Sequence, residues 1–157
     1  AGYEASGTSN MKFMMNGALT IGTLDGANAE IREAVGAENI VIFGLKAEEV
    51  AALCSQGCSP RTLCQNNPRL GKVVNQLIDG SLLPDPADEF RPLYDYLMQG
   101  HGNFFELEDF AAYVEAHAKI DALYRDPQVW WRIMAHNIAC SGAFSSDHTV
   151  SEYAIGI

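Results

Sequence analysis

Positive charge is scarce in this sequence of 157 residues. It contains 10 lysine and arginine residues against 20 aspartate and glutamate residues, a formal net charge of -10 at pH 7. Proteins that bind nucleic acid or anionic membrane surfaces generally carry an excess of positive charge on the binding face. The charge balance therefore argues against nucleic acid and against a membrane as partners. It does not argue against a local phosphate site, which needs only a few donors.

Long hydrophobic runs are also missing. No apolar stretch approaches the roughly 20 residues that a helix needs to cross a bilayer. Hydrophobic residues nevertheless make up 48% of the sequence, and they are spread along it. This composition suits the buried core of one globular domain.

Cysteines are few, and their spacing is uninformative. Cys54, Cys58 and Cys64 lie near one another, whereas Cys140 stands alone. They do not form the paired C-x-x-C spacing of a zinc site, and the histidines share no ligand spacing, so no metal site is expected. A chain of this size with this much core does not need a disulfide framework. We therefore expect reduced thiols, as in the cytoplasm.

The first third of the chain alternates helical and strand patterns. Continuous apolar runs at residues 18–22 and 39–43 predict buried strands, and each lies between stretches with helical periodicity. Buried strands that alternate with helices are typical of a parallel sheet covered by helices. The expected fold class is thus α/β. The expected helices of this portion are residues 10–15, 27–35 and 47–56.

Strand patterns end near residue 57. The remaining sequence predicts a mainly helical portion, so we divide the chain into an α/β part (1–57) and a helical part (58–157). Asp126-Pro127 is a typical helix start, with a capping carboxylate followed by proline at the first helical position. The expected helices of this portion are residues 60–64, 68–78, 88–98, 107–124, 127–140 and 147–155.

One short segment combines a possible anion site with a primary amine. A helix that begins among small residues leaves N–H groups free to hold an anion, and Lys12 lies about one turn inside that helix. Such starts are common, and most serve only to cap the helix, while a lone lysine is usually a solvated surface charge. The side chains with the right chemistry to cap this helix are Ser6, Thr8, Ser9 and Asn10.

The exact order of residues in this segment is more informative than its composition. Residues 4–13, Glu-Ala-Ser-Gly-Thr-Ser-Asn-Met-Lys-Phe, resemble the pyridoxal-phosphate segment of the α-glucan phosphorylases, which include glycogen, starch and maltodextrin phosphorylase. The resemblance continues through residues 16–28 and returns at residues 144–147. It implies a glycosyltransferase B-type fold of two Rossmann-like domains, of which this chain covers the second half of the C-terminal domain. The N-terminal domain is then absent, and both ends of the chain are expected to be cut.

The resemblance assigns cofactor roles to three residues. Lys12 corresponds to the lysine that forms a Schiff base with pyridoxal 5′-phosphate. Only a primary amine condenses with the cofactor's aldehyde, so no other residue type could replace it. Thr8 and Ser9 correspond to positions that bind the cofactor's phosphate. The expected anion site at the helix start agrees with this role.

The resemblance also implies a sugar site. Ser6 and Gly7 correspond to positions whose backbone amides hold the glucosyl unit, and Glu4 to an acid that hydrogen-bonds a sugar hydroxyl. Without the resemblance, Glu4 would be interpreted as an ordinary surface carboxylate. The sequence departs from the family pattern nearby, because Tyr3 stands where a small or polar residue is usual. His148 likewise replaces the usual arginine after residues 144–147.

The implied activity is transfer of a glucosyl unit from the non-reducing end of an α-1,4-glucan to inorganic phosphate, which gives glucose 1-phosphate. The resemblance also implies a cytoplasmic homo-oligomer. Two alternatives remain open: a sugar-nucleotide glycosyltransferase of related architecture, and a non-catalytic binding or assembly module. The Lys12 motif argues against the first, because those enzymes need no Schiff base. We expect these 157 residues alone to be inactive and not to retain the cofactor.

Overall fold

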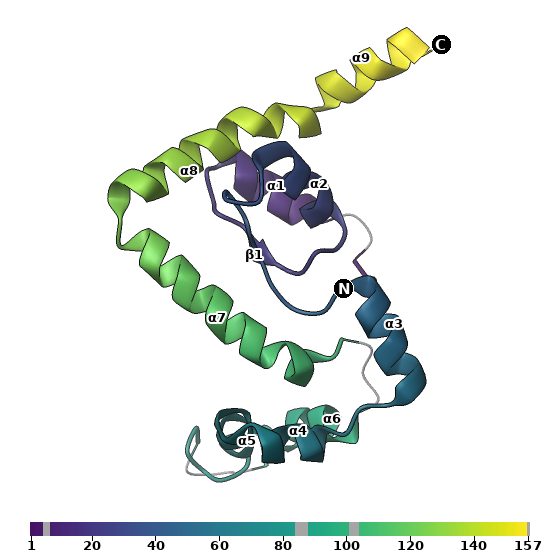
Figure 1. The fold of residues 1–157 in the computed structure, drawn as a ribbon, viewed down its shortest axis with the longest axis vertical. Helices are drawn as coiled ribbons and strands as arrows, with labels where there is room; N and C mark the ends of the chain where they lie inside the picture. Colours follow the sequence, from purple (N-terminus) through teal and green to yellow (C-terminus); the bar gives the residue numbers. More distant parts are fainter. Residues whose placement is uncertain (5–6, 84–87, 101–103, 157) are drawn as a thin grey trace. The chain divides into compact units, whose positions relative to one another are not determined.

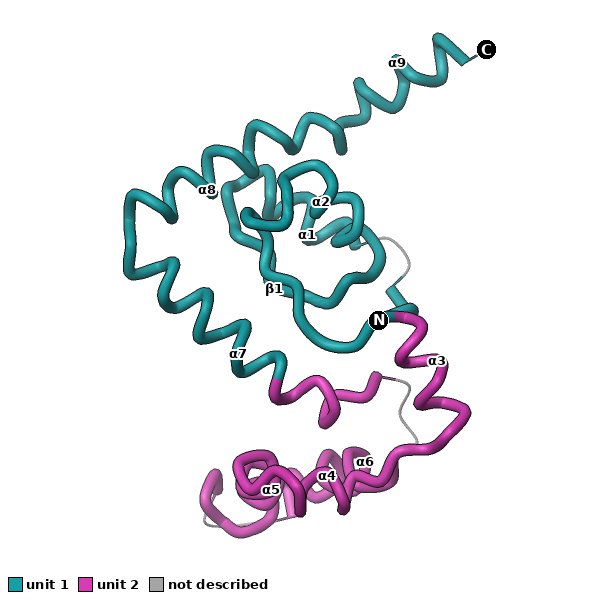
Figure 2. Tube along the Cα trace, in the orientation of Figure 1, with its two compact units in different colours: residues 1–46, 112–157 teal, residues 47–111 magenta. Residues whose placement is uncertain are grey.

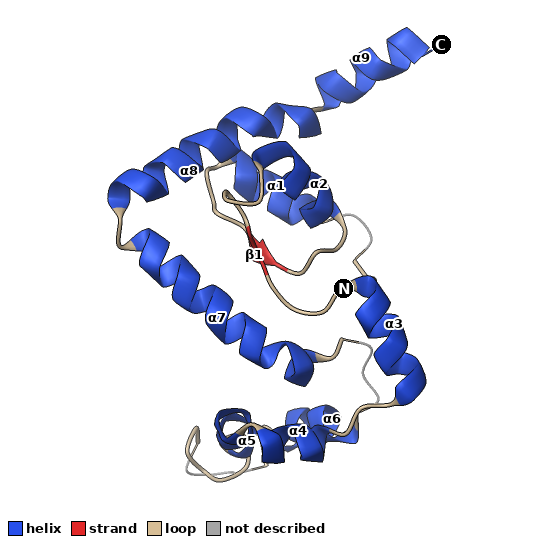
Figure 3. Cartoon of the chain, viewed as in Figure 1, coloured by secondary structure: helices blue, strands red, loops and turns tan. Residues whose placement is uncertain are grey.

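A computed structural model describes residues 1–4, 7–83, 88–100 and 104–156 of the chain (Figure 1). The chain divides into two compact units, one made of residues 1–46 and 112–157 and the other of residues 47–111 (Figure 2). Helices dominate the described residues, and a short pair of strands lies in the first unit (Figure 3). No helix in this described part is long and apolar enough to cross a membrane. The division of the chain at residue 57 stays a prediction.

The first unit begins with a helix–strand–helix–strand sequence and ends with helices. Its elements are α1 (Thr8–Met15), β1 (Ile21–Gly22), α2 (Ala27–Val35), β2 (Val41–Ile42), the part of α7 (Glu106–Tyr124) from residue 112, α8 (Pro127–Cys140), the 3₁₀ helix η1 (Ser141–Phe144) and α9 (Ser146–Gly156).

The two strands pair in parallel, as the sequence predicts. Ile21 lies opposite Val41, and the ladder continues through the N–H of Phe43, which donates to the carbonyl of Gly22 at 3.0 Å. Each strand has only two residues, so the expected spans 18–22 and 39–43 are too long. Each strand has one described neighbour, and the flanking residues therefore have no second ladder to hold them extended.

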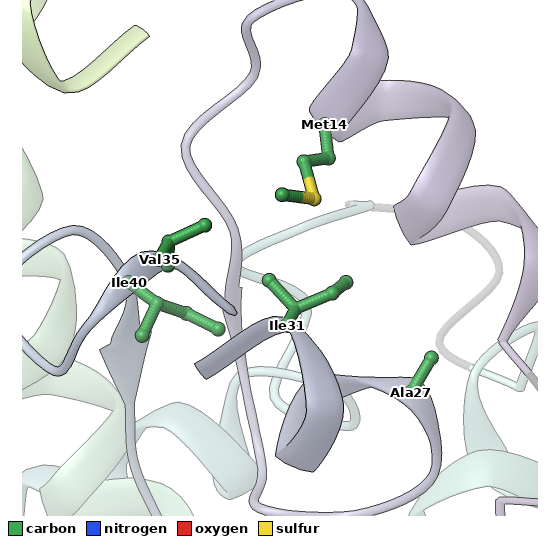
Figure 4. Packing of buried hydrophobic residues seen from close by; sticks show 5 residues of the cluster. All are labelled: Met14, Ala27, Ile31, Val35 and Ile40. Carbon is green, nitrogen blue, oxygen red and sulfur yellow. The ribbon is translucent and has the colours of Figure 1, made fainter. Parts of the chain in front are cut away.

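A small hydrophobic core holds the first unit together (Figure 4). Ala27, Ile31 and Val35 are spaced four residues apart along α2, so they lie on one face of it and are buried there. Met14 of α1 and Ile40, just before β2, complete the cluster. Each of the five side chains is at most 2% exposed. This burial fixes α1 against α2 and brings the start of α1 next to the loop between β1 and α2.

Helix α8 packs on α1 and α2 and is tied to the end of α2 by polar contacts. Nε2 of His136 lies 3.0 Å from the carbonyl oxygen of Val35, and the buried Asn137 donates through Nδ2 to the carbonyl of Asn39 at 3.1 Å. These contacts satisfy backbone acceptors where α2 gives way to β2. The Asp126 carboxylate accepts from the N–H groups of Gln128 and Val129, which confirms the expected cap of α8.

The second unit contains helices and no strand among its described residues, and it shows the same capping chemistry. It contains α3 (Ala47–Gln56), α4 (Pro60–Asn66), α5 (Pro68–Asn75), α6 (Arg91–Gln99) and the part of α7 up to residue 111. Ser59 and Asn67 cap α4 and α5 through their side-chain oxygens, and each is followed by proline at the first helical position. The helices expected here are confirmed, with ends that match or are shifted by up to three residues. The sequence also predicts a helix break at residues 100–103 and a loop at 79–86; Gly100 is the C-cap of α6, whereas 101–103 and part of the loop lie outside the described residues.

All four cysteines are free thiols. The Cys58 Sγ donates to Oε1 of Glu108 at 3.3 Å within the second unit. Burial raises the pKa of the Cys58 thiol to about 11, together with the hydrogen bond to Glu108 and its negative charge. Among the described residues, no group of three His, Cys, Asp or Glu side chains could hold a metal ion.

The core of the first unit predicts a large difference between two isoleucines. Ile31→Ala should lower the free energy of unfolding by about 2–5 kcal/mol, because Ile31 is 1% exposed and its loss leaves a cavity. Ile155→Ala removes the same atoms from a residue that is 86% exposed. It should change the free energy of unfolding by less than about 0.5 kcal/mol. Urea denaturation followed by circular dichroism measures both. Equal losses would contradict this core.

The pKa of Cys58 predicts its reactivity. The thiolate is the reactive form, so alkylation of Cys58 by iodoacetamide should be slow at pH 8 and rise about tenfold per pH unit until the pH approaches the pKa of about 11. Glu108→Gln removes the nearby charge and should speed the reaction at pH 8. Mass spectrometry of the Cys58 peptide gives the rates. A rate that levels off near pH 9 would be inconsistent with the Glu108 contact.

Candidate functional site

The start of α1 presents backbone N–H groups and has no side-chain cap among the described residues. Gly7 stands at the N-cap with a φ of 68°, in the left-handed region that favours glycine. A Cβ on residue 7 would lie 2.8 Å from Oδ1 of Asn10, so close packing also requires glycine. Among the described residues, no side chain caps this helix, and Thr8, Ser9 and Asn10 lie inside it. Their expected capping role is therefore wrong, and the N–H groups of the first turn keep their capacity to bind an anion.

A pair of asparagine amides joins α1 to the start of α2 and to the loop before it. Nδ2 of Asn10 donates to Oδ1 of Asn28 at 2.6 Å, and Nδ2 of Asn28 donates to the carbonyl of Thr23 at 2.9 Å. Because the second bond fixes how the Asn28 amide is turned, it also fixes the Asn10 amide. Oδ1 of Asn10 is left buried without a partner among the described residues. The amide pair thus sets the distance between the start of α1 and the start of α2.

Asp25 holds the N-terminal segment by its backbone. Its Oδ2 accepts hydrogen bonds from the N–H groups of Gly2, Tyr3 and Glu4, at 2.6, 2.9 and 3.0 Å. Its Oδ1 accepts from the N–H of Gly26 at 2.8 Å. Burial alone would raise the pKa of Asp25, but the four hydrogen bonds favour the ionised form, and the pKa is lowered below its ordinary value. The Asp25 side chain is therefore ionised at neutral pH.

These contacts surround an open hollow of about 420 Å³ on the first unit. Glu4 lines one part of it, and Phe13 of α1, which is 63% exposed, gives it an apolar surface. In the described part of the chain, the Glu4 carboxylate has no hydrogen-bond or ion-pair partner, so it is available to a ligand. The lining residues are Glu4, Gly7, Ser9, Asn10, Phe13, Gly22, Thr23, Asp25 and Asn28.

The predicted site residues fall into two groups in the structure. Glu4, Gly7 and Ser9 meet in the hollow. Thr8 and Lys12 do not line it, and both are exposed. Being four residues apart on α1, Thr8 and Lys12 lie on the same side of the helix, about one turn from each other. Ser6 lies outside the described residues. Ser9, predicted to bind the cofactor phosphate, thus lines the hollow with the predicted sugar residues Glu4 and Gly7, whereas Thr8 and Lys12 lie outside it.

The sequence prediction did not include the holding roles of three residues of the hollow: Asn10, Asp25 and Asn28. An Asp-Gly pair predicts a turn. The Asp25 side chain accepts from the N–H of Gly26, a local contact that is typical of aspartate in turns. Its other donors are 21 to 23 residues away in sequence. No local pattern could have indicated them, although residues 16–28 belong to the resemblance.

His148, which departs from the family pattern, lies on α9 and is exposed. Its Nε2 is 3.5 Å from Oε1 of Glu152, one turn further along the same helix. This is a surface contact within one helix, and such pairs contribute little to stability. Tyr3 is 49% exposed and does not line the hollow, so its side chain leaves the site open.

Comparison with known proteins covers the whole chain. The family model described as carbohydrate phosphorylase matches residues 1–157. Over 154 residues, the chain is 49% identical to the brain form of glycogen phosphorylase of Homo sapiens and 47% identical to that of Rattus norvegicus. It is 46% identical to the muscle form of Homo sapiens. Each alignment covers 98% of this chain and 18% of the relative, so the chain spans about a fifth of the length of these relatives. With a family match from its first residue to its last, the chain belongs to the carbohydrate phosphorylases.

Proposed function

We propose that the complete protein is a pyridoxal-phosphate-dependent α-glucan phosphorylase. It transfers a glucosyl unit from the non-reducing end of an α-1,4-glucan to inorganic phosphate and releases glucose 1-phosphate. The observation that carries the proposal is the hollow where Glu4 and Ser9 lie beside an uncapped helix start. The identity to glycogen phosphorylases supports it. Because the chain spans 18% of these relatives, the proposal concerns the complete protein.

The residues at the start of α1 fit the chemistry of the cofactor. Lys12 is the only lysine in α1; it is exposed and has no ion-pair partner in the described part of the chain. Its amine is therefore accessible to an aldehyde. Thr8 and Ser9 occupy the first two helical positions, where backbone N–H groups and hydroxyls favour a phosphate. When bound, pyridoxal 5′-phosphate supplies a phosphate group that passes a proton to and from the substrate phosphate.

The hollow has the polar groups to bind a glucosyl unit. The Glu4 carboxylate accepts a hydrogen bond from a sugar hydroxyl, and the N–H of Gly7 donates one to the sugar. We extend the same role to Ser6, on the basis of the resemblance alone. Phe13 adds an apolar surface to the hollow beside these polar groups. A carboxylate that binds the sugar more strongly in the transition state than in the ground state raises the rate.

The surroundings of the site follow from the same proposal. The β1–β2 pair is part of a larger Rossmann-like sheet, and its domain faces a second one across a cleft in a glycosyltransferase B-type fold. The parallel direction of the pair, with helices on either side in sequence, supports this arrangement. The complete protein is a cytoplasmic homo-oligomer. Its substrates are the glucan and phosphate.

The first test is the position of the cofactor. Borohydride reduction of the complete protein, followed by peptide mapping, should place the pyridoxyl group on Lys12. Lys12→Arg keeps the charge but cannot condense with an aldehyde, so it should lose both the covalent attachment and the formation of glucose 1-phosphate from maltoheptaose and phosphate. Lys46→Arg, Lys72→Arg and Lys119→Arg are the controls and should keep both. A pyridoxyl group on any of these three lysines would overturn the assignment.

The second test is the sugar contact of Glu4. Glu4→Gln in the complete protein should lower kcat/KM. The expected loss corresponds to about 1–3 kcal/mol of transition-state stabilisation, on the scale of a charged hydrogen bond. Cofactor content, measured by absorbance, should not change, because Glu4→Gln leaves the Lys12 amine and the N–H groups at the start of α1 in place. Glu115→Gln, at an exposed position of α7, is the control. An unchanged kcat/KM in Glu4→Gln would leave Glu4 a surface acid.

A further inference from the structure

We propose that Asp25 is a positioning residue that acts on the reaction through Glu4. The inference deepens the proposed function and rests on it, because it concerns how the sugar-binding carboxylate is held. Its basis is that one oxygen of Asp25 accepts the N–H groups of three consecutive residues, and Glu4 is the last of them. A carboxylate that gathers successive N–H groups fixes the direction of that backbone.

Both oxygens of Asp25 are already engaged. Oδ2 accepts from Gly2, Tyr3 and Glu4, and Oδ1 accepts from Gly26. Asp25 lines the hollow, but its hydrogen-bonding capacity is directed at the backbone and not at a ligand. The Glu4 carboxylate, by contrast, has no partner among the described residues. The two acids therefore have different proposed roles. Asp25 holds the backbone of residues 2–4, and the Glu4 carboxylate hydrogen-bonds the sugar.

Gly26 supplies the second constraint on Glu4. A Cβ on residue 26 would lie 2.7 Å from Cγ of Glu4 and 3.2 Å from its Cβ. The Glu4 side chain thus passes directly over the Cα of Gly26, where no other residue leaves room. Asp25 holds the backbone of Glu4, and Gly26 restricts the position of the Glu4 side chain. The turn formed by these two residues therefore constrains both the backbone and the side chain of Glu4.

The contacts of Asp25 are separate from the core of the unit. The core cluster consists of Met14, Ala27, Ile31, Val35 and Ile40. Gly2, Tyr3 and Glu4 are all exposed, so freeing their backbone uncovers little apolar surface. Loss of the Asp25 contacts should therefore disorder the Glu4 segment while the packing of α1 on α2 persists. Activity would then fall without a general loss of structure.

A double-mutant cycle in the complete protein, with its cofactor, tests the proposal. Asp25→Asn keeps the shape but removes the charge and turns one acceptor into a donor, so it should lower kcat/KM by about 5- to 50-fold. In a Glu4→Gln background, where the sugar contact is already weakened, the same change should have an effect of less than about twofold. Cofactor absorbance should stay at the level of the unchanged protein. Asp121→Asn, at an exposed acid of α7 that pairs with Arg125, should leave kcat/KM unchanged in both backgrounds.

A second measurement does not depend on activity. Hydrogen exchange of the peptide that contains Gly2, Tyr3 and Glu4, followed by mass spectrometry, should be at least about tenfold faster in Asp25→Asn, because three N–H groups lose their acceptor. Exchange in α2 should not change. If Asp25→Asn does not fold, Asp25→Glu replaces it in the same cycle, because it keeps the charge and moves the acceptor by one methylene group.

The outcomes separate this proposal from the proposed function. A complete protein that forms no glucose 1-phosphate from maltoheptaose and phosphate overturns the proposed function, while the exchange experiment still decides whether Asp25 holds the segment. An active protein in which the Asp25 and Glu4 effects are additive overturns the positioning role alone. Unchanged kcat/KM or unchanged exchange in Asp25→Asn overturns it as well.

Discussion

Burial of Met14 against α2 is the contact on which the rest of the first unit depends. Helix α1 is short, and helices of eight residues are marginal on their own, so its position comes from packing. Met14 faces Ile31 and its neighbours, which fixes the rotation of α1 about its axis. That rotation places Ser9 and Phe13 at the hollow and turns Thr8 and Lys12 to another side. One buried thioether side chain thereby decides which side chains of α1 line the hollow.

The proposed anion site at the start of α1 is compatible with an acidic chain. The net charge of -10 describes the whole sequence, whereas anion binding is a local property of donors. At the start of α1 the donors are backbone N–H groups, which carry no formal charge and need no nearby arginine. Gly7 makes this possible, because its left-handed conformation opens the helix without a side chain over its end. Excess negative charge elsewhere on the chain is compatible with such a site.

Short polar side chains do most of the alignment between the elements around the hollow. The Asn10–Asn28 amide pair sets α1 against the start of α2, and Asp25 sets the N-terminal segment against the same loop. Each of these side chains uses backbone or amide partners within the protein. The carboxylate of Glu4 and the amine of Lys12 remain available to a ligand. They lie on the segments that Asp25, Asn10 and Asn28 hold in place. This separation between holding residues and available residues is what the proposed function requires.

The sequence by itself determined the features whose causes are local. Helices α2 and α3 follow from periodicity and end residues, and the cap of α8 follows from Asp126-Pro127, because each involves groups within a few positions of one another. The order of residues 4–13 indicated the family. Tertiary structure decided the rest: the two-residue length of each strand, glycine rather than a hydroxyl at the start of α1, and the grip of Asp25 on residues 2–4. These depend on which distant groups packing brings within hydrogen-bonding distance, and a contact across 21 to 23 positions leaves no periodic trace in a sequence.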